Sequence, residues 1–178
     1  MSTPFPKEKE RTIDFILSNP TREIRVRELA RQLRVSPAHV SKTLKALRKH
    51  NVLKDGKVDL SNPYVKALKI FFNIKKLAEK NIPDKLRLLG IAGAGIYGSW
   101  ASGTNHEDSD LDIWIKVDKH PGEVRVASIS VDLRKTVGSN VQILVLTPER
   151  LARLRKEDPL FYFSLVYGSM LIYGEAIE

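Results

Sequence analysis

The stretch Tyr97–Ile115 reads Y-G-S-W-A-S-G-T-N-H-E-D-S-D-L-D-I-W-I, and it decides how the second half of the chain is interpreted. A strand-like segment ends at Gly98-Ser99, a polar loop follows, and Asp110 and Asp112 stand two positions apart. Strand side chains alternate between faces, so we expect the two carboxylates to point the same way. Adjacent carboxylates repel each other unless a cation lies between them. The pattern therefore predicts a site for Mg²⁺ bound together with a nucleotide.

The spacing of Gly98-Ser99, ten further residues and Asp110-Leu111-Asp112 resembles the G-S-x10-D-x-D signature of the DNA polymerase β nucleotidyltransferase superfamily. The likeness is to the small prokaryotic members and covers about residues 84–178. It implies that Gly98 and Ser99 hold the phosphates of ATP or another NTP. It also implies that Asp110 and Asp112 are the catalytic, Mg²⁺-binding pair. The reaction would place a nucleoside monophosphate on an acceptor hydroxyl and release pyrophosphate.

Two positions depart from that family pattern. The family has a third carboxylate in an apolar-acid-apolar triplet on the next strand, and the matching triplet here contains Gln142. An amide binds metal weakly and cannot act as a base. Ser102 stands where the family commonly has arginine, so a cation near the phosphates is missing. Asp132 could supply the third acid if residues 123–133 formed a strand, but the Gly138-Ser139-Asn140 stop favours a helix.

Two other interpretations of this stretch are a dinucleotide-binding motif and a pair of surface aspartates without a function. Residues 93–98, G-A-G-I-Y-G, match the G-x-G-x-x-G pattern of dinucleotide-binding folds. That fold needs a long helix beginning inside the motif, and the polar residues 102–105 do not favour one. Alternatively, Asp110 and Asp112 could simply be surface residues of an edge strand. The neighbouring Gly98-Ser99 pair favours the nucleotidyltransferase interpretation.

Charge is distributed unevenly along the chain. Residues 1–80 carry 19 Lys+Arg against 8 Asp+Glu, and residues 81–178 carry 11 against 13. A basic first half and a slightly acidic second half indicate domains with different partners. We predict a DNA-binding domain at residues 1–62, a linker helix at 63–82 and a nucleotidyltransferase-like domain at 83–178.

The first half has the element order of a known DNA-binding domain. Helical patterns at residues 7–17, 27–33 and 37–50 are followed by an expected hairpin at 52–60 with Asp-Gly at its turn. The segment L-A-R-Q-L-R-V-S-P-A-H-V-S-K-T-L-K-A-L resembles the winged helix-turn-helix domains of bacterial and archaeal transcription regulators. Arg34 occupies a turn position where such domains often have glycine. The resemblance covers roughly residues 8–61.

The third of these helices has a free basic face. At 100° per residue, Val40, Leu44 and Leu47 share one side. The other side and the expected wing carry the predicted DNA-binding residues, which are Ser41, Lys42, Lys45, Lys49, Lys54 and Lys57. The resemblance implies that the helix enters the major groove of duplex DNA while the wing touches phosphates. The alternatives are a solvated basic helix or a winged helix used for protein contacts.

The remaining segments predict an α+β protein: an N-terminal winged helix-turn-helix, a linker helix, and a C-terminal nucleotidyltransferase-fold mixed sheet flanked by helices. Strands are expected at residues 91–97, 113–117, 141–146 and 170–173, and helices at 84–89, 123–137, 148–156 and 160–167. The helix at residues 64–80 is apolar on more than one side. It either forms interdomain core or pairs with its counterpart in a homodimer.

Composition narrows the class of protein. The chain has no cysteine, no apolar run of membrane-spanning length and a polar amino terminus, so we expect a cytoplasmic protein without a membrane partner. Two functions remain. One is a nucleotidyltransferase delivered to DNA, similar to antitoxins of the family that modify a toxin-like partner protein. The other is a non-catalytic transcriptional regulator that uses the fold to sense a nucleotide or bind a partner.

Overall fold

The computed structural model describes residues 6–178, which divide into two compact units. Unit 1 comprises the residues up to Phe72 together with Gly103–Glu107, and unit 2 comprises Asn73–Ser102 and Asp108–Glu178. The long helix α4 (Pro63–Glu79) contributes its first half to unit 1 and its second half to unit 2. Its Val65 and Phe72 lie in the core of unit 1 and its Leu77 in a core of unit 2, which accounts for its apolar residues on several sides.

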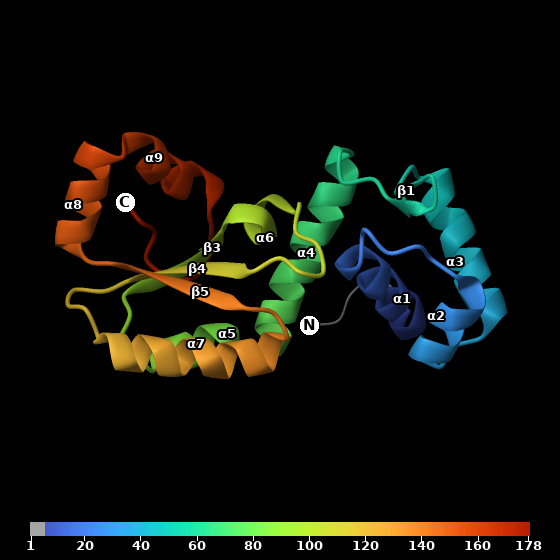
Figure 1. The fold of residues 1–178 in the computed structure, drawn as a ribbon, viewed down its shortest axis with the longest axis horizontal. Coiled ribbons are helices and arrows are strands. Elements are labelled where there is room, and N and C mark those ends of the chain that lie inside the picture. The colour runs from blue at the N-terminus through green and yellow to red at the C-terminus, as the bar shows by residue number, and fades with distance from the viewer. Residues whose placement is uncertain (1–5) are drawn as a thin grey trace. The chain divides into compact units, whose positions relative to one another are not determined.

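Unit 1 contains short helices, a small hairpin and the first half of α4 (Figure 1). The elements are α1 (Lys7–Ser18), α2 (Val26–Leu33), α3 (Pro37–Lys49), β1 (Leu53–Lys54) and β2 (Lys57–Val58). Its core includes Ile16, Leu29 and Leu44, each at most 4% exposed. The predicted inward face of α3 is confirmed, since Val40, Leu44 and Leu47 are all buried.

Local sequence signals explain how these elements begin and end. The Ser36 hydroxyl accepts a hydrogen bond of 3.1 Å from the backbone N–H of His39, and Pro37 opens α3. Arg34 ends α2 in the left-handed conformation with φ 53°, which explains why glycine suits this position. Asp55 and Gly56 also have positive φ, as a tight hairpin turn requires.

Unit 2 is a four-stranded mixed sheet covered by helices. Its strands are β3 (Gly93–Tyr97), β4 (Leu111–Lys116), β5 (Val141–Leu146) and β6 (Met170–Gly174), in the spatial order β5-β4-β3-β6. β3 is antiparallel to β4 and β6, whereas β4 and β5 are parallel. The helices are α5 (Ile82–Arg87), α6 (Gly98–Ser102), α7 (Glu123–Val137), α8 (Pro148–Glu157) and α9 (Pro159–Gly168).

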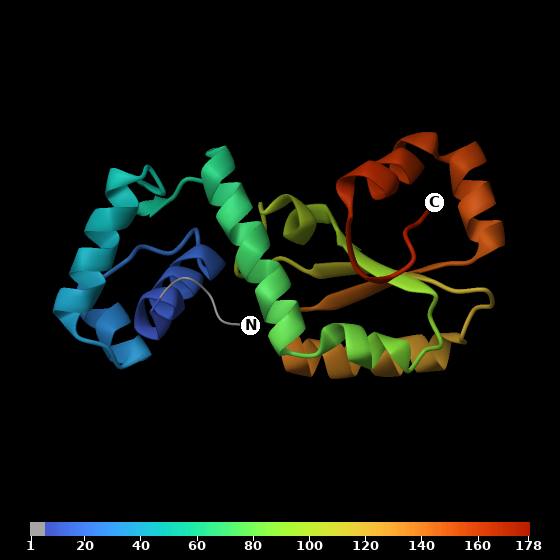
Figure 2. The same cartoon turned by 180° about the vertical axis from the view of Figure 1, so that it is seen from behind.

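The two faces of this sheet bury different helices. Ile96, Ile113 and Ile115 are fully buried on one face, in the same core as Leu86 of α5 and Leu133 of α7. On the other face Trp114 packs in a second core with residues of α8 and α9. Figures 1 and 2 show α5 and α7 along one side of the sheet and α8 and α9 along the other. The predicted α+β class with a mixed sheet flanked by helices is confirmed for this unit.

Two details of unit 2 differ from the sequence analysis. The helix at residues 123–137 is confirmed. The helical spacing of Val124, Ala127 and Val131 predicts its inner face, and this is wrong: Val124 is 84% exposed and Val131 52%, while Val126 and Leu133 are buried. Both sides of α7 carry valines, so the spacing alone could not select the inner side. After Tyr97 the chain forms a five-residue helix, α6, where only a turn was expected.

The helical state of α7 also removes Asp132 as the third acid. Its carboxylate lies on a helix surface and pairs with Lys85 Nζ at 2.7 Å. It therefore serves to join α7 to α5.

Candidate active site

The predicted aspartates lie at the beginning of β4, a central strand of the sheet of unit 2. Asp112 on β4 is paired in register with Tyr97 on β3 and with Gln142 on β5. Paired residues of neighbouring strands project from the same face, so these three side chains form a row. Asp110 precedes β4 by one position and lies on the same side, because its carboxylate is bonded to Gln142.

The two carboxylates act on each other electrostatically. Asp112 is half-buried, and its pKa is raised first by burial and then by the negative charge of Asp110. A divalent cation between the two groups would relieve both effects, since it stabilises the ionised forms. The carboxylate oxygens are also the donor type that Mg²⁺ prefers. The aspartate pair therefore fits one Mg²⁺.

Gln142 completes the row with a donor instead of an acid. Its Nε2 donates a hydrogen bond of 2.7 Å to Asp110 Oδ2. This bond orients Asp110 and presents an N–H group, without a lone pair, at the position where the sequence resemblance implies a third carboxylate. Within residues 6–178, no cluster of three or more His, Cys, Asp or Glu side chains is placed to hold a metal. The residues present thus do not fit a second metal held by a third acid.

Gly98 brings the start of α6 against the aspartates. Its φ is +65°, and a Cβ built on it would lie 2.7 Å from Asp112 Oδ2. Only glycine combines that backbone conformation with so close an approach. Ser99 follows and is half-buried, and its carbonyl accepts a hydrogen bond of 3.3 Å from the Ser102 hydroxyl. The structure therefore brings Gly98 against Asp112 and Asp110 near Asp112, and Ser99 is the residue that follows Gly98 in the chain.

Two residues near this site were missed by the sequence analysis. Burial raises the pKa of Tyr97, the charge of Asp112 raises it further, and the charge of Arg150 on α8 acts in the opposite direction. Arg150 is therefore near enough to supply positive charge on the site's side of the sheet, where Ser102 supplies none. Tyr97 also packs edge-on against Phe161, with ring centroids 6.4 Å apart. No motif spacing marks either residue; the parallel register of β4 and β5 brings α8 here.

The residues predicted to bind DNA are all exposed on unit 1. Ser41, Lys42, Lys45 and Lys49 are exposed on α3, and Lys54 and Lys57 face each other across the β1–β2 hairpin and are also exposed. This set is called the basic face below. It carries no buried charge, so its lysines are available to a polyanion.

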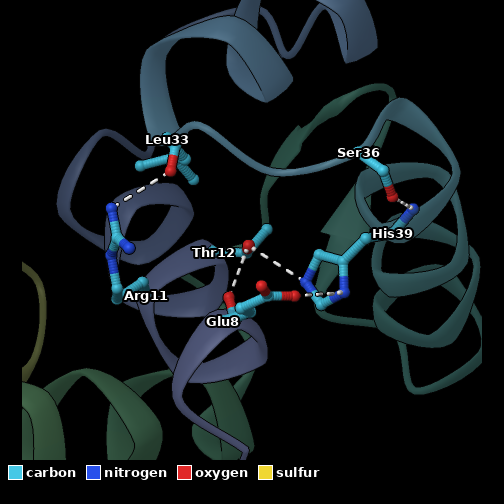
Figure 3. A network of polar contacts seen from close by, with 6 residues as sticks. All are labelled: Glu8, Arg11, Thr12, Leu33, Ser36 and His39. Atoms are coloured by element: carbon cyan, nitrogen blue, oxygen red, sulfur yellow. Dashed lines mark hydrogen bonds and ion pairs between the residues drawn. The ribbon is translucent and has the colours of Figure 1, made fainter.

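Polar contacts hold α3 against α1 (Figure 3). The Thr12 hydroxyl donates to the carbonyl of Glu8 at 2.8 Å and lies 3.4 Å from His39 Nε2. His39 Nδ1 is 3.9 Å from a Glu8 carboxylate oxygen, and Arg11 donates to the carbonyl of Leu33 at 3.1 Å. His39 therefore points toward α1, and the contacts fix the position of the basic face.

No helix in the described part of the chain is long and apolar enough to cross a membrane.

Comparison with known proteins agrees with the geometry of unit 2. The family model described as "Polymerase beta, Nucleotidyltransferase" matches residues 73–176. No curated protein matches the sequence. Among solved structures, a chain from the "Crystal structure of the toxin-antitoxin with AMP-PNP" is 20% identical and covers 54% of this chain and 73% of that chain, with a TM-score of 0.44. The family match spans more than half of the chain, and the chain belongs to the polymerase β nucleotidyltransferase family.

Proposed function

We propose that this chain is a DNA-binding regulator whose nucleotidyltransferase-fold unit binds a nucleoside triphosphate with Mg²⁺. The observation that carries the proposal is the close approach of the Gly98 backbone to the Asp110–Asp112 pair. A Cβ placed on Gly98 would lie 2.7 Å from Asp112 Oδ2. Asp110 and Asp112 would hold the metal, which supplies positive charge to the phosphates. The Gly98 backbone and the Ser99 hydroxyl would bind phosphate oxygens. Arg150 would add charge from α8.

Gln142 favours nucleotide binding over nucleotide transfer. Transfer to a hydroxyl needs a group that takes its proton and, in this family, a third carboxylate beside the aspartates. Gln142 provides neither, and its amide hydrogen bond to Asp110 occupies one of the oxygens that a second metal would need. We therefore place nucleotide sensing ahead of catalysis.

Transfer of a nucleoside monophosphate to a partner protein is the second candidate. It is supported by the intact Gly98-Ser99 and Asp110-x-Asp112 signature and by membership of the family. The acceptor hydroxyl would attack the α-phosphorus and lose its proton to water. The bond from the α-phosphorus to the oxygen that bridges to the β-phosphate would break, and pyrophosphate would leave with that oxygen. An antitoxin-like role on a toxin-like partner would follow from this activity.

We also propose that unit 1 is a winged helix-turn-helix domain that binds duplex DNA. The element order α1, α2, α3, β1 and β2 supports this proposal, as does the basic face. Residues 1–80 hold 19 of the chain's 30 Lys+Arg, so most of the positive charge belongs to the half of the chain that includes the basic face, and this supports binding to a phosphate backbone.

Calorimetry with Mg-ATP and the other common NTPs tests the nucleotide site. The wild-type chain should bind at least one of them, and the double variant Asp110→Ala, Asp112→Ala should bind none. Asp118→Ala is the matched control, because it removes an exposed carboxylate of unit 2 outside the site and should leave the affinity unchanged. A wild-type chain that binds no nucleotide would refute both candidate functions.

Gln142→Glu separates sensing from transfer. The substitution restores a carboxylate at the third position with almost no change of shape. If the wild type is a sensor, it binds Mg-ATP without releasing pyrophosphate, while the variant gains turnover by a factor on the order of 100 or more. The measurement is pyrophosphate release, and nucleotide adducts by mass spectrometry, with the proteins that copurify as acceptors. Turnover by the wild type at the variant's rate would favour the transfer candidate.

A further inference from the structure

The loop between α6 and β4 is divided between the two units. Gly98–Ser102 and the residues from Asp108 onward belong to unit 2, whereas Gly103–Glu107 pack as part of unit 1. These five residues, called the shared loop below, lie inside the segment that separates Gly98-Ser99 from Asp110. A part of the candidate nucleotide-binding signature is therefore held by the unit that carries the basic face.

The first end of the shared loop is fixed by backbone packing. Gly103 is buried with φ +68°, and a Cβ built on it would lie 2.4 Å from the carbonyl oxygen of Lys66 in α4. The chain can thus pass at this distance only without a side chain. Movement of the first half of α4 would be transmitted directly to Gly103.

The other end of the shared loop is fixed by polar contacts. The Thr21 hydroxyl donates a hydrogen bond to Glu107 Oε1. Burial opposes the ionisation of Glu107, but the hydrogen bonds from Thr21 and from backbone N–H groups outweigh burial and lower its pKa. Burial lowers the pKa of Lys69, and the charge of Glu107 opposes that lowering. Lys69 Nζ donates to the carbonyl of Leu17 at 2.5 Å. Glu107 therefore binds the connection that follows α1.

The hairpin contacts the same connection. Pro20, next to Thr21, accepts a hydrogen bond of 3.3 Å from the backbone N–H of Val58 on β2. Lys57, which belongs to the basic face, is the neighbouring residue of that strand. One short connection thus contacts both the hairpin and Glu107, and Glu107 precedes Asp110 by only three positions.

We propose that the shared loop couples the two binding events, so that duplex DNA on the basic face changes the affinity of unit 2 for Mg-NTP. This inference rests on the proposed function of both units. DNA contact with the hairpin shifts the connection at Pro20 and Thr21, and the shift reaches Asp110 through Glu107. By linkage, the nucleotide changes the affinity for DNA by the same factor.

The test measures each ligand's affinity with and without the other. The probes are a fluorescent non-hydrolysable ATP analogue with Mg²⁺ and a short mixed-sequence DNA duplex at low salt. In the wild type, saturating DNA should change the affinity for the analogue at least about fivefold, and saturating analogue should change the affinity for DNA equally. Thr21→Ala and Glu107→Ala should bring the factor close to one while each ligand still binds alone.

Controls separate this coupling from damage to the fold. Thr21→Ser keeps the hydroxyl and should keep the coupling factor. Glu157→Ala removes an exposed glutamate on α8 and should also keep it. Wild-type affinities that do not depend on the other ligand would overturn the coupling and leave the proposed function intact. Failure of either ligand to bind the wild type overturns the proposed function and the coupling with it.

Discussion

Gly98 meets two constraints at one residue. Its backbone has φ +65°, and a side chain there would press on Asp112 Oδ2 at 2.7 Å. A left-handed backbone costs a non-glycine residue about 1–2 kcal/mol. The steric contact adds a second cost, which falls on a metal-binding group of the proposed site.

We therefore expect Gly98→Ala to lose nucleotide affinity by a factor of about 10 or more, together with about 1–2 kcal/mol of stability. Calorimetry and chemical denaturation measure the two effects. Gly138→Ala is the matched control, since Gly138 has φ +82° and open space around its Cβ position. It should lose similar stability with no change in nucleotide affinity. Equal nucleotide affinity in the wild type and Gly98→Ala would contradict the site.

Lys69 is a second residue with a measurable signature. Its side chain is 1% exposed, and burial lowers its pKa from 10.5 to about 8. The unfolded chain therefore holds a proton at this position over a pH range in which the folded chain has released it. Stability must then rise with pH between those two pKa values. Below about pH 8 both states hold the proton, and the full cost of burying the charge is present.

We expect the free energy of unfolding to rise between about pH 8 and pH 10.5, which are the folded and the ordinary pKa of Lys69, and to be less pH-dependent in Lys69→Met. The comparison of the two proteins removes the contributions of all other groups. Urea denaturation at a series of pH values measures the difference. Parallel curves for the two proteins would show that Lys69 is not titrating in this range.

At the scale of elements, α3 and the hairpin carry the proposed DNA contacts. The double variant Lys42→Glu, Lys45→Glu should weaken binding to duplex DNA at every sequence tested. The slope of log K against log salt should fall by about 2, because two phosphate contacts are lost. Lys119→Glu with Lys156→Glu makes the same change of charge on unit 2 and serves as the control. Unchanged DNA affinity in the α3 variant would remove the assignment.

The elements with strong local signals were predictable from sequence. Ser36-Pro37 marked the start of α3, Asp55-Gly56 marked the hairpin turn, and the apolar run of β5 marked a buried strand. The inner face of α7 was not predictable, because Val124 and Val126 are equally apolar and the sheet decides which is buried. The short helix α6 starts at Gly98 directly after β3, and no Ser, Thr, Asp or Asn before it marks its start in the sequence.

Only those residues of the candidate site that belong to a sequence motif were predictable. The motif spacing predicted Gly98, Ser99, Asp110 and Asp112 as site residues, and the triplet pattern pointed to Gln142. Tyr97 and Arg150 become neighbours of the site through strand register and through the position of α8. Their signals are spatial, so a motif search has nothing to detect.

At the scale of the whole molecule, both tryptophans, Trp100 and Trp114, lie in unit 2. Intrinsic fluorescence therefore follows the unfolding of the unit that carries the proposed nucleotide site. With Mg-ATP at about 100 times its Kd, the free energy of unfolding reported by fluorescence should rise by about 2.7 kcal/mol. The measurement is urea denaturation with and without the nucleotide, and Asp112→Ala should show no rise. An unchanged wild-type midpoint at saturation would contradict nucleotide binding by the folded unit.

The hydrogen bond from Gln142 to Asp110 has a consequence for how the chain can evolve. Codons for glutamine and glutamate differ at a single base, and the two side chains have nearly the same shape. If the acid restores turnover, a sensor and an enzyme built on this fold are one point mutation apart, with no intermediate that must refold. The same short distance applies in reverse, so an active member of such a lineage can become a nucleotide-binding regulator in one step and keep its DNA-binding unit unchanged.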